Sequence, residues 1–283
     1  MKTGANKIFV FNPIESKGST IRLRPEGQEH AVELEAALLH PYWKAESMKR
    51  YANRSSRRLL LYPYILKDGK TALMSSDVLK SSYPRTWDYL STHRPTLESR
   101  QKGKLKGPNW YGLSFASNLR MFSSLKIVTP TLAMQNSFSL DEEGHFFPQG
   151  AGGGCGMVVR DDSSIAYLMG VLNSKLLTFY FRRISSHFQG GYFAYEPRYL
   201  QRMPIHTIDS SDSEDVAWHD WMVELVERML ELHKRMAEAK IERERTVIQH
   251  QIDATDRQID QLVYKLYGLS DEEIAIVEEG TSS

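Results

Sequence analysis

The chain has 283 residues, of which 41% are hydrophobic and 25% are charged, as is usual for a globular protein. This length can bury a core in one large domain or in two modest ones. Apolar runs stay below the ~18 residues of a membrane span and no signal-peptide pattern opens the sequence, so we expect a cytoplasmic location without a membrane partner. The single cysteine, Cys155, excludes an internal disulfide framework and a multi-thiolate metal site, and it fits a reducing compartment.

The net charge of +1 conceals an uneven distribution along the chain. Residues 40–126 carry 17 Lys and Arg against 5 Asp and Glu, whereas residues 209–283 carry 8 against 19. A strongly basic block favours a polyanionic partner, because phosphate contacts release counterions. A solvated basic face is the alternative interpretation.

The first two thirds of the chain mix strand patterns with helix patterns. Short apolar runs predict strands at 8–11, 59–66, 125–129 and 156–160, the second of them interrupted at Pro63 because proline cannot donate to a ladder. Apolar residues at helical spacing predict helices at 84–100, where Pro95 can introduce a kink, and at 163–182. The mixture predicts an α+β fold with a mixed sheet.

The sequence of the last third of the chain predicts long helices. A Ser/Asp-rich linker covers 209–215, and no Gly or Pro occurs between Trp218 and Tyr267. The spacing of Trp218, Met222, Leu225, Met229, Leu232 and Met236 is that of a coiled-coil seam. Because the phase slips across 237–246, one long helix with a stutter and a helical hairpin both remain open.

The sequence predicts two domains, 1–208 and a coiled-coil-like helical region at 209–283, with self-association through 218–266 as an option for the seam. Ser270 and Glu273 have the spacing of a capping box, which predicts a last helix at 271–279.

Catalytic signatures are weak. The cluster Gly150–Gly156 suggests a nucleotide or methyl-donor loop, but it follows a polar turn and precedes the apolar run Met157–Val159 instead of opening a helix. No Lys-Ser or Lys-Thr pair supports a phosphate loop, the histidines lack metal-site spacing, and Cys155 has no adjacent base. We therefore expect no catalytic residue, metal site or cofactor in this chain.

Candidate nucleic-acid contacts are more numerous. Cations are interleaved with aromatic and amide side chains in 49–58 and 100–111, and a polar glycine-containing loop covers 185–192. Lys and Arg suit phosphates, Arg, Asn and Gln can read base edges, and aromatic rings can stack. The candidate double-stranded DNA contacts are Lys49, Arg50, Arg54, Arg57, Arg58, Arg100, Lys102, Lys104, Lys106, Asn109, Arg120, Ser185, His187, Gln189 and Tyr192. Solubilising surface loops are the alternative.

An ordered series of short motifs resembles a known family. The segments are Lys2-Thr3-Gly4-Ala5-Asn6-Lys7-Ile8-Phe9-Val10, Lys49-Arg50-Tyr51, Leu61-Tyr62-Pro63-Tyr64, Lys126-Ile127-Val128-Thr129-Pro130, Leu172-Asn173-Ser174-Lys175-Leu176, Gln189-Gly190-Gly191-Tyr192, Tyr199-Leu200-Gln201-Arg202-Met203-Pro204-Ile205 and 259–274. Together they resemble the TaqI-like C-terminal specificity domain of adenine-specific DNA methyltransferases and Type IIG restriction–modification enzymes.

The resemblance implies a target-recognition domain followed by long C-terminal helices. The methyl-donor loop and the Asn-Pro-Pro-Tyr-type catalytic motif of the larger enzymes are missing, since the only Asn-Pro here is Asn12-Pro13-Ile14. We therefore expect sequence-specific DNA recognition without catalysis by the chain alone. S-adenosylmethionine is expected on a methyltransferase or nuclease domain or subunit, so the chain would be a truncated enzyme or a separately encoded recognition subunit.

Two rival functions stay open. A methyl-donor-dependent DNA methyltransferase would use the Gly150–Gly156 loop, and saturable binding of the methyl donor would support it. A coiled-coil scaffold with an incidental basic patch would bind DNA weakly and without regard to sequence.

Overall fold

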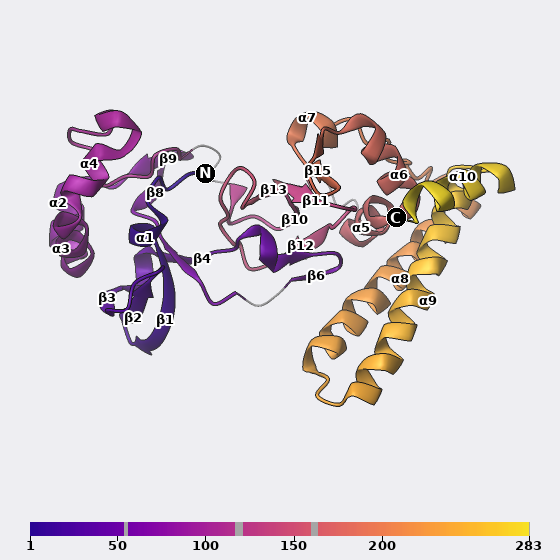
Figure 1. Ribbon diagram of the computed structural model, residues 1–283, viewed down its shortest axis with the longest axis horizontal. Helices are drawn as coiled ribbons and strands as arrows, with labels where there is room; N and C mark the ends of the chain where they lie inside the picture. The colour runs from indigo at the N-terminus through magenta and orange to yellow at the C-terminus, as the bar shows by residue number, and fades with distance from the viewer. Residues whose placement is uncertain (54–55, 117–120, 160–163, 283) are drawn as a thin grey trace. The chain divides into compact units, whose positions relative to one another are not determined.

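The computed structural model describes residues 1–53, 56–116, 121–159 and 164–282 (Figure 1). They form two compact units: unit 1 comprises Met1–Lys44, Ser55–Leu125 and Glu142–Gly153, and unit 2 comprises Ala45–Arg54, Lys126–Asp141 and Gly154–Ser283. The composition change predicted as a domain boundary, between 208 and 209, falls inside unit 2. Residues on both sides of this point therefore belong to the same compact unit, although the charge of the sequence changes there.

Unit 1 is built on a five-stranded antiparallel sheet of order β3-β2-β1-β7-β4. Its strands are β1 (Val10–Lys17), β2 (Thr20–Pro25), β3 (Val32–Glu35), β4 (Leu39–Pro41) and β7 (Leu59–Leu61). The strand predicted at 8–11 begins only at Val10, because the amides of Ile8 and Phe9 bond to the Ala5 carbonyl and close one helical turn, α1 (Asn6–Phe9). That turn buries both side chains.

The other elements described in unit 1 are a short 3-10 helix, η1 (Ala36–Leu38), a hairpin and three further helices. The hairpin pairs β8 (Tyr64–Lys67) with β9 (Lys70–Leu73), so the predicted interruption at Pro63 is confirmed. The helices are α2 (Ser76–Ser82), α3 (Pro84–Thr92) and α4 (Arg94–Gly103). The single helix predicted at 84–100 is broken at His93, because Pro95 has no N–H to continue the α3 ladder and instead occupies the first turn of α4.

The described residues of unit 2 form three small antiparallel sheets. Their strands are β5 (Met48–Lys49) with β6 (Ala52–Asn53), β12 (Ser139–Asp141) with β10 (Lys126–Pro130) and β13 (Gly154–Met157), and β11 (Leu132–Ala133) with β15 (Tyr192–Ala194) and β14 (His187–Phe188). A 3-10 helix, η2 (Ala45–Ser47), precedes β5. The strand predicted at 125–129 corresponds to β10, whereas the one predicted at 156–160 starts earlier and ends at Met157.

The helix predicted at 163–182 is two helices, α5 (Ile165–Asn173) and α6 (Lys175–Ile184). Ser174 separates them: its backbone is extended, and its hydroxyl accepts from the Leu177 amide as the N-cap of α6. A short helix, α7 (Pro197–Leu200), follows β15.

The C-terminal region is a helical hairpin, which settles the choice left open by the sequence. Helices α8 (Ser213–Glu238) and α9 (Glu242–Leu266) lie side by side (Figure 1), because Ala239 and Ile241 take extended backbone conformations and reverse the chain. The predicted capping box of Ser270 and Glu273 is confirmed at the start of α10 (Asp271–Thr281).

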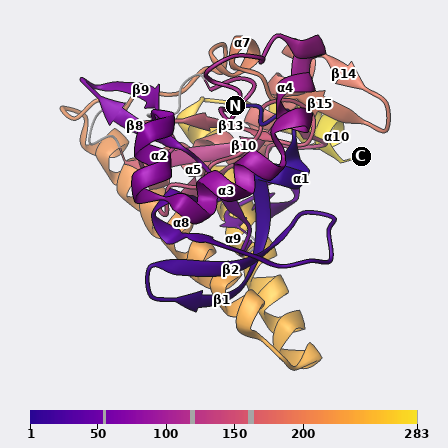
Figure 2. The ribbon, with the colours of Figure 1, turned by 90° about the vertical axis from the view of Figure 1, so that its left-hand side faces the viewer.

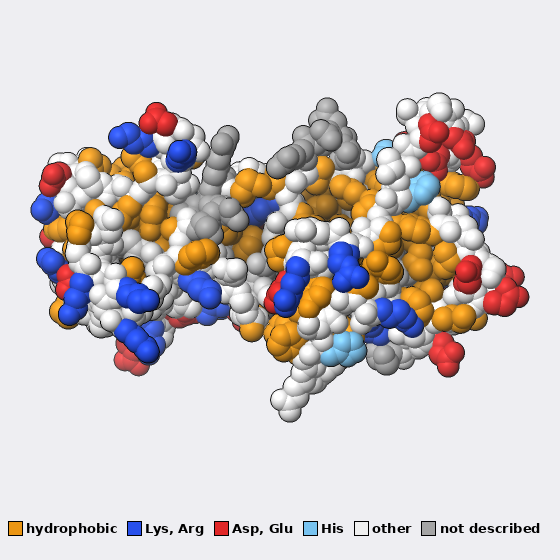
Figure 3. Space-filling model, turned by 90° about the horizontal axis from the view of Figure 1, so that it is seen from above, with side chains coloured by type: hydrophobic (Ala, Val, Ile, Leu, Met, Phe, Trp, Pro, Cys, Tyr) orange, Lys and Arg blue, Asp and Glu red, His pale blue; other side chains and the backbone are white. Residues whose placement is uncertain are grey.

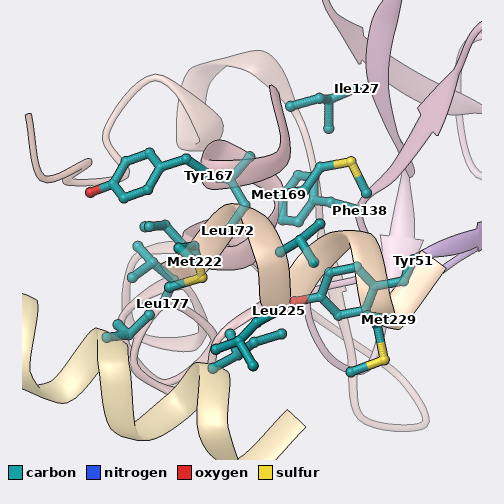
Figure 4. Packing of buried hydrophobic residues seen from close by; sticks show 14 of the residues in the cluster. Tyr51, Ile127, Phe138, Tyr167, Met169, Leu172, Leu177, Met222, Leu225 and Met229 are labelled. Carbon is teal, nitrogen blue, oxygen red and sulfur yellow. The ribbon is translucent and has the colours of Figure 1, made fainter. Parts of the chain in front are cut away.

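Four of the seam residues of α8, Met222, Leu225, Met229 and Leu232, are buried in the core of unit 2, and the other two, Trp218 and Met236, are partly buried against it. Figure 4 shows Met222 near Leu172 of α5 and Met229 beside Tyr51 of the β5–β6 turn, in the cluster that also contains Leu225 and Ile127 of β10. The acidic helices and the small sheets therefore share one hydrophobic core, in an α+β architecture. Within the described ranges, no helix combines the length and apolar character that a membrane crossing needs.

Candidate nucleic-acid interface

Arg100 organises the basic loop of unit 1, residues 100–111, which begins at the kink inside α4 where Arg100, Gln101 and Lys102 leave the helical conformation. Its guanidinium donates to four backbone carbonyls, Nε to Leu97 (2.8 Å), Nη1 to Thr3 (2.7 Å) and Nη2 to Trp110 (2.7 Å) and Gly112 (2.9 Å). The residue is only 8% exposed. Because its donors are used inside the protein, Arg100 positions the loop, and we remove it from the set of proposed DNA contacts.

The backbone after Arg100 is held in an unusual conformation. Gln101 (φ 52°) and Lys102 (φ 59°) are both left-handed, although neither is glycine. Such conformations cost of the order of 1 kcal/mol each and persist where neighbouring contacts fix them. Here the Gln101 side chain donates to the Ser114 carbonyl (3.1 Å), and the preceding residue, Arg100, is anchored by the hydrogen bonds of its own guanidinium.

This loop presents cations on a fixed backbone. Lys102, Lys104, Lys106 and Asn109 are exposed, while the adjacent Trp110 is buried. Lysines on flexible stems are suited to phosphate oxygens, which do not require a planar fork. On the face shown in Figure 3, Lys and Arg prevail among the charged side chains of unit 1, and Asp and Glu gather at the end that carries α10.

The basic stretch at 49–58 is divided between the two units. Lys49 and Arg50 belong to unit 2, whereas Arg57 and Arg58 belong to unit 1. Lys49 and Arg57 are exposed and Arg58 is partly exposed. Arg54 and Arg120 lie outside the described residues.

Arg50 has its partners inside unit 2. Its Nη2 and Nη1 atoms lie 2.6 and 2.7 Å from Oδ1 and Oδ2 of Asp256 on α9, and Nη2 also donates to the Asn173 carbonyl (2.8 Å). The bidentate geometry is that of a strong charge-assisted pair. Arg50 thus ties the β5–β6 turn to the helical hairpin, and we remove it as well from the set of base readers.

A second acid of α9 supports the same junction. Asp260 accepts from the Lys175 amide at the start of α6 (2.8 Å), and its other oxygen lies 3.9 Å from the Lys175 ammonium. Burial raises the pKa of Asp260 to about 7, and the nearby charge of Asp256 adds to this effect. The Lys175 amide, Arg50 and Lys175 act in the opposite direction.

The loop predicted at 185–192 is the exposed end of a small sheet. Strands β14 and β15 form a hairpin (Figure 2) that pairs Phe188 with Tyr192, and Gly190 and Gly191 supply the positive φ angles of its turn. His187, Gln189 and Tyr192 are exposed. Ser185 is buried and donates to the Ala194 carbonyl (2.8 Å), so it positions the hairpin instead of facing solvent.

The glycine cluster has a structural explanation. It leads into strand β13, not into a helix whose free amides could hold a phosphate or a methyl donor. A Cβ atom on Gly153 would stand 1.6 Å from the Pro148 carbonyl oxygen, and one on Gly154 would stand 2.4 Å from the Met48 sulfur. Close packing therefore requires glycine at both positions.

Nucleophile and metal chemistry find little support among the described residues. Burial raises the pKa of Cys155 to about 11, which keeps the thiol protonated at neutral pH. Across the described part of the chain, no three His, Cys, Asp or Glu side chains are grouped as a metal site needs.

Sequence reasoning missed the two aspartates of α9. The net negative charge of 209–283 indicated helices that pack on the recognition domain or dock a partner, but it did not identify the residues that make the contact. Asp256 and Asp260 are four residues apart and so share a helix face, and Asp260 follows the buried Ile259 directly. The signal that could have identified them is the position of two acidic residues on the buried side of an apolar helix face, because a buried carboxylate needs a cationic or hydrogen-bonding partner.

Comparison with known proteins agrees with the family resemblance seen in the sequence motifs. Residues 73–205 match the model of the TaqI-like C-terminal specificity domain, which confirms the resemblance over that range. The chain is 25% identical to the Type II restriction enzyme and methyltransferase RM.Eco57I of Escherichia coli, in an alignment that covers 99% of this chain and 29% of that protein. It is 23% identical to the Type II methyltransferase M.BanIII of Aneurinibacillus aneurinilyticus, over 76% of this chain and 35% of that protein. The chain thus spans about a third of the length of these relatives.

Proposed function

We propose that the chain is the sequence-specific DNA-recognition part of a restriction–modification adenine DNA methyltransferase or endonuclease. The observation that carries this proposal is the specificity-domain match over 73–205, which includes both the Arg100-anchored loop and the β14–β15 hairpin. Both segments have anchored backbones and exposed polar or cationic tips. Each of these segments is therefore suited to contact a duplex with a fixed backbone behind it.

The exposed residues divide by chemistry into two groups. Lys49, Lys102, Lys104 and Lys106 are suited to the phosphate backbone, and they set affinity without sequence preference. Arg57, Asn109 and Gln189 have the planar donor and acceptor groups that read guanine or adenine edges, and Arg58, His187 and Tyr192 are auxiliary contacts. Arg50, Arg100 and Ser185 act as positioning residues.

Catalysis in this proposal takes place outside the residues described above. The relatives named as methyltransferases are about three times as long as the aligned segment. We therefore propose a methyltransferase or nuclease domain or subunit as the partner, with S-adenosylmethionine bound on that partner. The chain supplies specificity and the partner supplies turnover.

Selection of bound sites from a pool of random duplexes tests the proposal. The full chain is used with and without a methyltransferase partner, and the recovered sites are sequenced. We expect one enriched motif whose affinity falls steeply with salt concentration. A pool without an enriched motif, in both conditions, would contradict the proposed function.

A further inference from the structure

Three apolar side chains form one row across the sheet of order β11-β15-β14. Phe188 pairs with Tyr192 across the hairpin. In the β11–β15 register Leu132 pairs with Ala194 and Ala133 with Phe193. Met134 directly follows β11, and its methyl carbon lies beside Gly191, the residue before Tyr192. We call Met134, Tyr192 and Phe188 the apolar row.

The apolar row faces outward. Met134 is 50%, Tyr192 42% and Phe188 49% exposed. Side chains alternate between the faces of a strand, and the neighbouring Ala133 and Phe193 are buried in the core of unit 2. The inward row thus anchors the sheet while the outward row is left uncovered.

The backbone beneath the row is held in place. The Met134 carbonyl accepts from Nη2 of Arg182 on α6 (3.1 Å), and the Met134 methyl carbon lies 3.6 Å from where a Cβ of Gly191 would stand. The three side chains are therefore presented on a short, anchored sheet and not on an unstructured loop.

Arginines flank the hairpin of this row in the sequence. Between residues 182 and 202 the chain has four arginines and a single glutamate. Arg183, Arg198 and Arg202 are exposed. Exposed apolar side chains in an arginine-rich stretch of the chain fit a polyanion that also offers apolar groups, as a DNA groove does.

We propose that the apolar row reads thymine by contact with its 5-methyl group in the major groove, an inference that rests on the proposed function. The thymine methyl is the apolar group on the major-groove edges of the bases, and a two-stranded ribbon fits that groove. Gln189, at the tip of the same hairpin, has the amide that pairs with adenine N6 and N7. The hairpin would therefore select a subsite that contains A·T pairs.

Replacement of thymine by uracil tests this directly, because it removes only the methyl group. The full chain is titrated with its selected duplex and with duplexes in which each thymine in turn is uracil. We expect a loss of about three- to fivefold at one or two positions, the size expected for burial of one methyl group. Phe188→Ala should bind the thymine and uracil duplexes equally, because the partner of the methyl group is gone.

Ile276→Ala is the matched control, since Ile276 is an exposed apolar residue of α10, away from this sheet in the sequence. It should keep the full sensitivity to uracil, and thermal unfolding should show that both variants are folded. Equal binding of thymine and uracil duplexes by the unaltered chain, a selected site without thymine, or uracil sensitivity that survives in Phe188→Ala would each overturn the inference. So would loss of methyltransferase binding by Phe188→Ala with its DNA binding unchanged. If no sequence is enriched at all, the proposed function itself fails, which is a different result.

Discussion

Arg50 and Asp256 form a bidentate ion pair although 206 positions separate them in the sequence. The pair joins a basic turn near the beginning of the chain to an acidic helix near its end, inside unit 2. The two charge blocks that the sequence keeps apart are therefore partly neutralised against each other. Helix α9 acts as a support for the β5–β6 turn, next to the exposed Lys49.

Loss of this pair should destabilise unit 2. Asp256→Asn and Arg50→Met are each expected to lower the free energy of unfolding by about 1–3 kcal/mol, the range for hydrogen bonds to charged groups. The double variant should lose less than the sum, because the second substitution finds no partner left to remove. Urea unfolding of the four proteins gives the coupling energy.

Asp253→Asn is the control for that cycle. Asp253 lies on the exposed side of the same helix and accepts from Gln249 near the surface. Its substitution should change stability by less than about 0.5 kcal/mol. Strict additivity of Arg50→Met and Asp256→Asn would show that the ion pair contributes nothing to stability.

Arg100 is expected to be required for the stability of unit 1. Arg100→Met removes donors from four carbonyls at once and should cost about 2–4 kcal/mol, since unpaired buried acceptors are expensive. Arg94→Met, on the exposed part of α4, should cost no more than about 1 kcal/mol, because it loses a surface ion pair with Glu98 and a cation–π contact with the Trp110 ring. Thermal unfolding distinguishes the two. Equal losses would mean that the carbonyl contacts do not stabilise the loop.

Asp260 should make the stability of unit 2 depend on pH. Its folded pKa of about 7 lies above the ordinary value of 3.8, so between these values the folded protein binds a proton that the unfolded chain does not. Stability contributed at this site is thus fully present below about pH 4, and it decreases as the pH rises towards 7. Asp260→Asn can still accept from the Lys175 amide and should be less sensitive to pH over this range.

The measurement is the difference in unfolding free energy between Asp260→Asn and the unaltered chain at several pH values from 4.5 to 8. Using the difference cancels the contributions of the other titrating groups, among them His233, whose pKa is lowered chiefly by burial. We expect the difference to favour the variant more and more up to about pH 7 and then to level off. A difference that does not change with pH would contradict the raised pKa.

Cys155 should react slowly with thiol reagents. Because burial raises its pKa to about 11, the thiolate fraction at pH 8 is about a hundredfold smaller than for a thiol in the unfolded chain. Alkylation by iodoacetamide, followed by mass spectrometry in native and in denaturing buffer, measures the ratio. Similar rates in the two buffers would show that the thiol is not shielded in the folded protein.

Helix-forming patterns and capping motifs were the most reliable guides to the fold. The seam of α8 and the box formed by Ser270 and Glu273 are local signals, and both elements were predicted from them. The kink predicted at Pro95 is a full break at His93, and the break at Ser174 was not located, because a short helix break depends on how the two segments pack, which a periodic pattern does not record. The reversal at Ala239 was left open for the same reason.

The candidate site was predicted unevenly. A count of cations finds Lys102, Lys104 and Lys106, which are exposed. The same count also selects Arg50 and Arg100, whose guanidinium groups are bonded inside the protein. Charge and spacing cannot separate a cation that faces solvent from one that anchors a loop, since the difference lies in partners that come from distant parts of the chain, such as Thr3 and Asp256.

Salt-dependent binding to the selected duplex and to a scrambled duplex tests the central proposal, DNA recognition by the basic loops, most directly. Alanine at Lys102, Lys104 and Lys106 should weaken both duplexes alike and lower the slope of log affinity against log salt by about 3, close to one per phosphate contact. Arg57→Ala should cost about 1–3 kcal/mol on the selected duplex only. Alanine at Lys234, Lys240 and Lys265, which are exposed on the C-terminal helices and the turn between α8 and α9, should leave both affinities unchanged. Equal losses for all three variants on both duplexes would contradict the assignment.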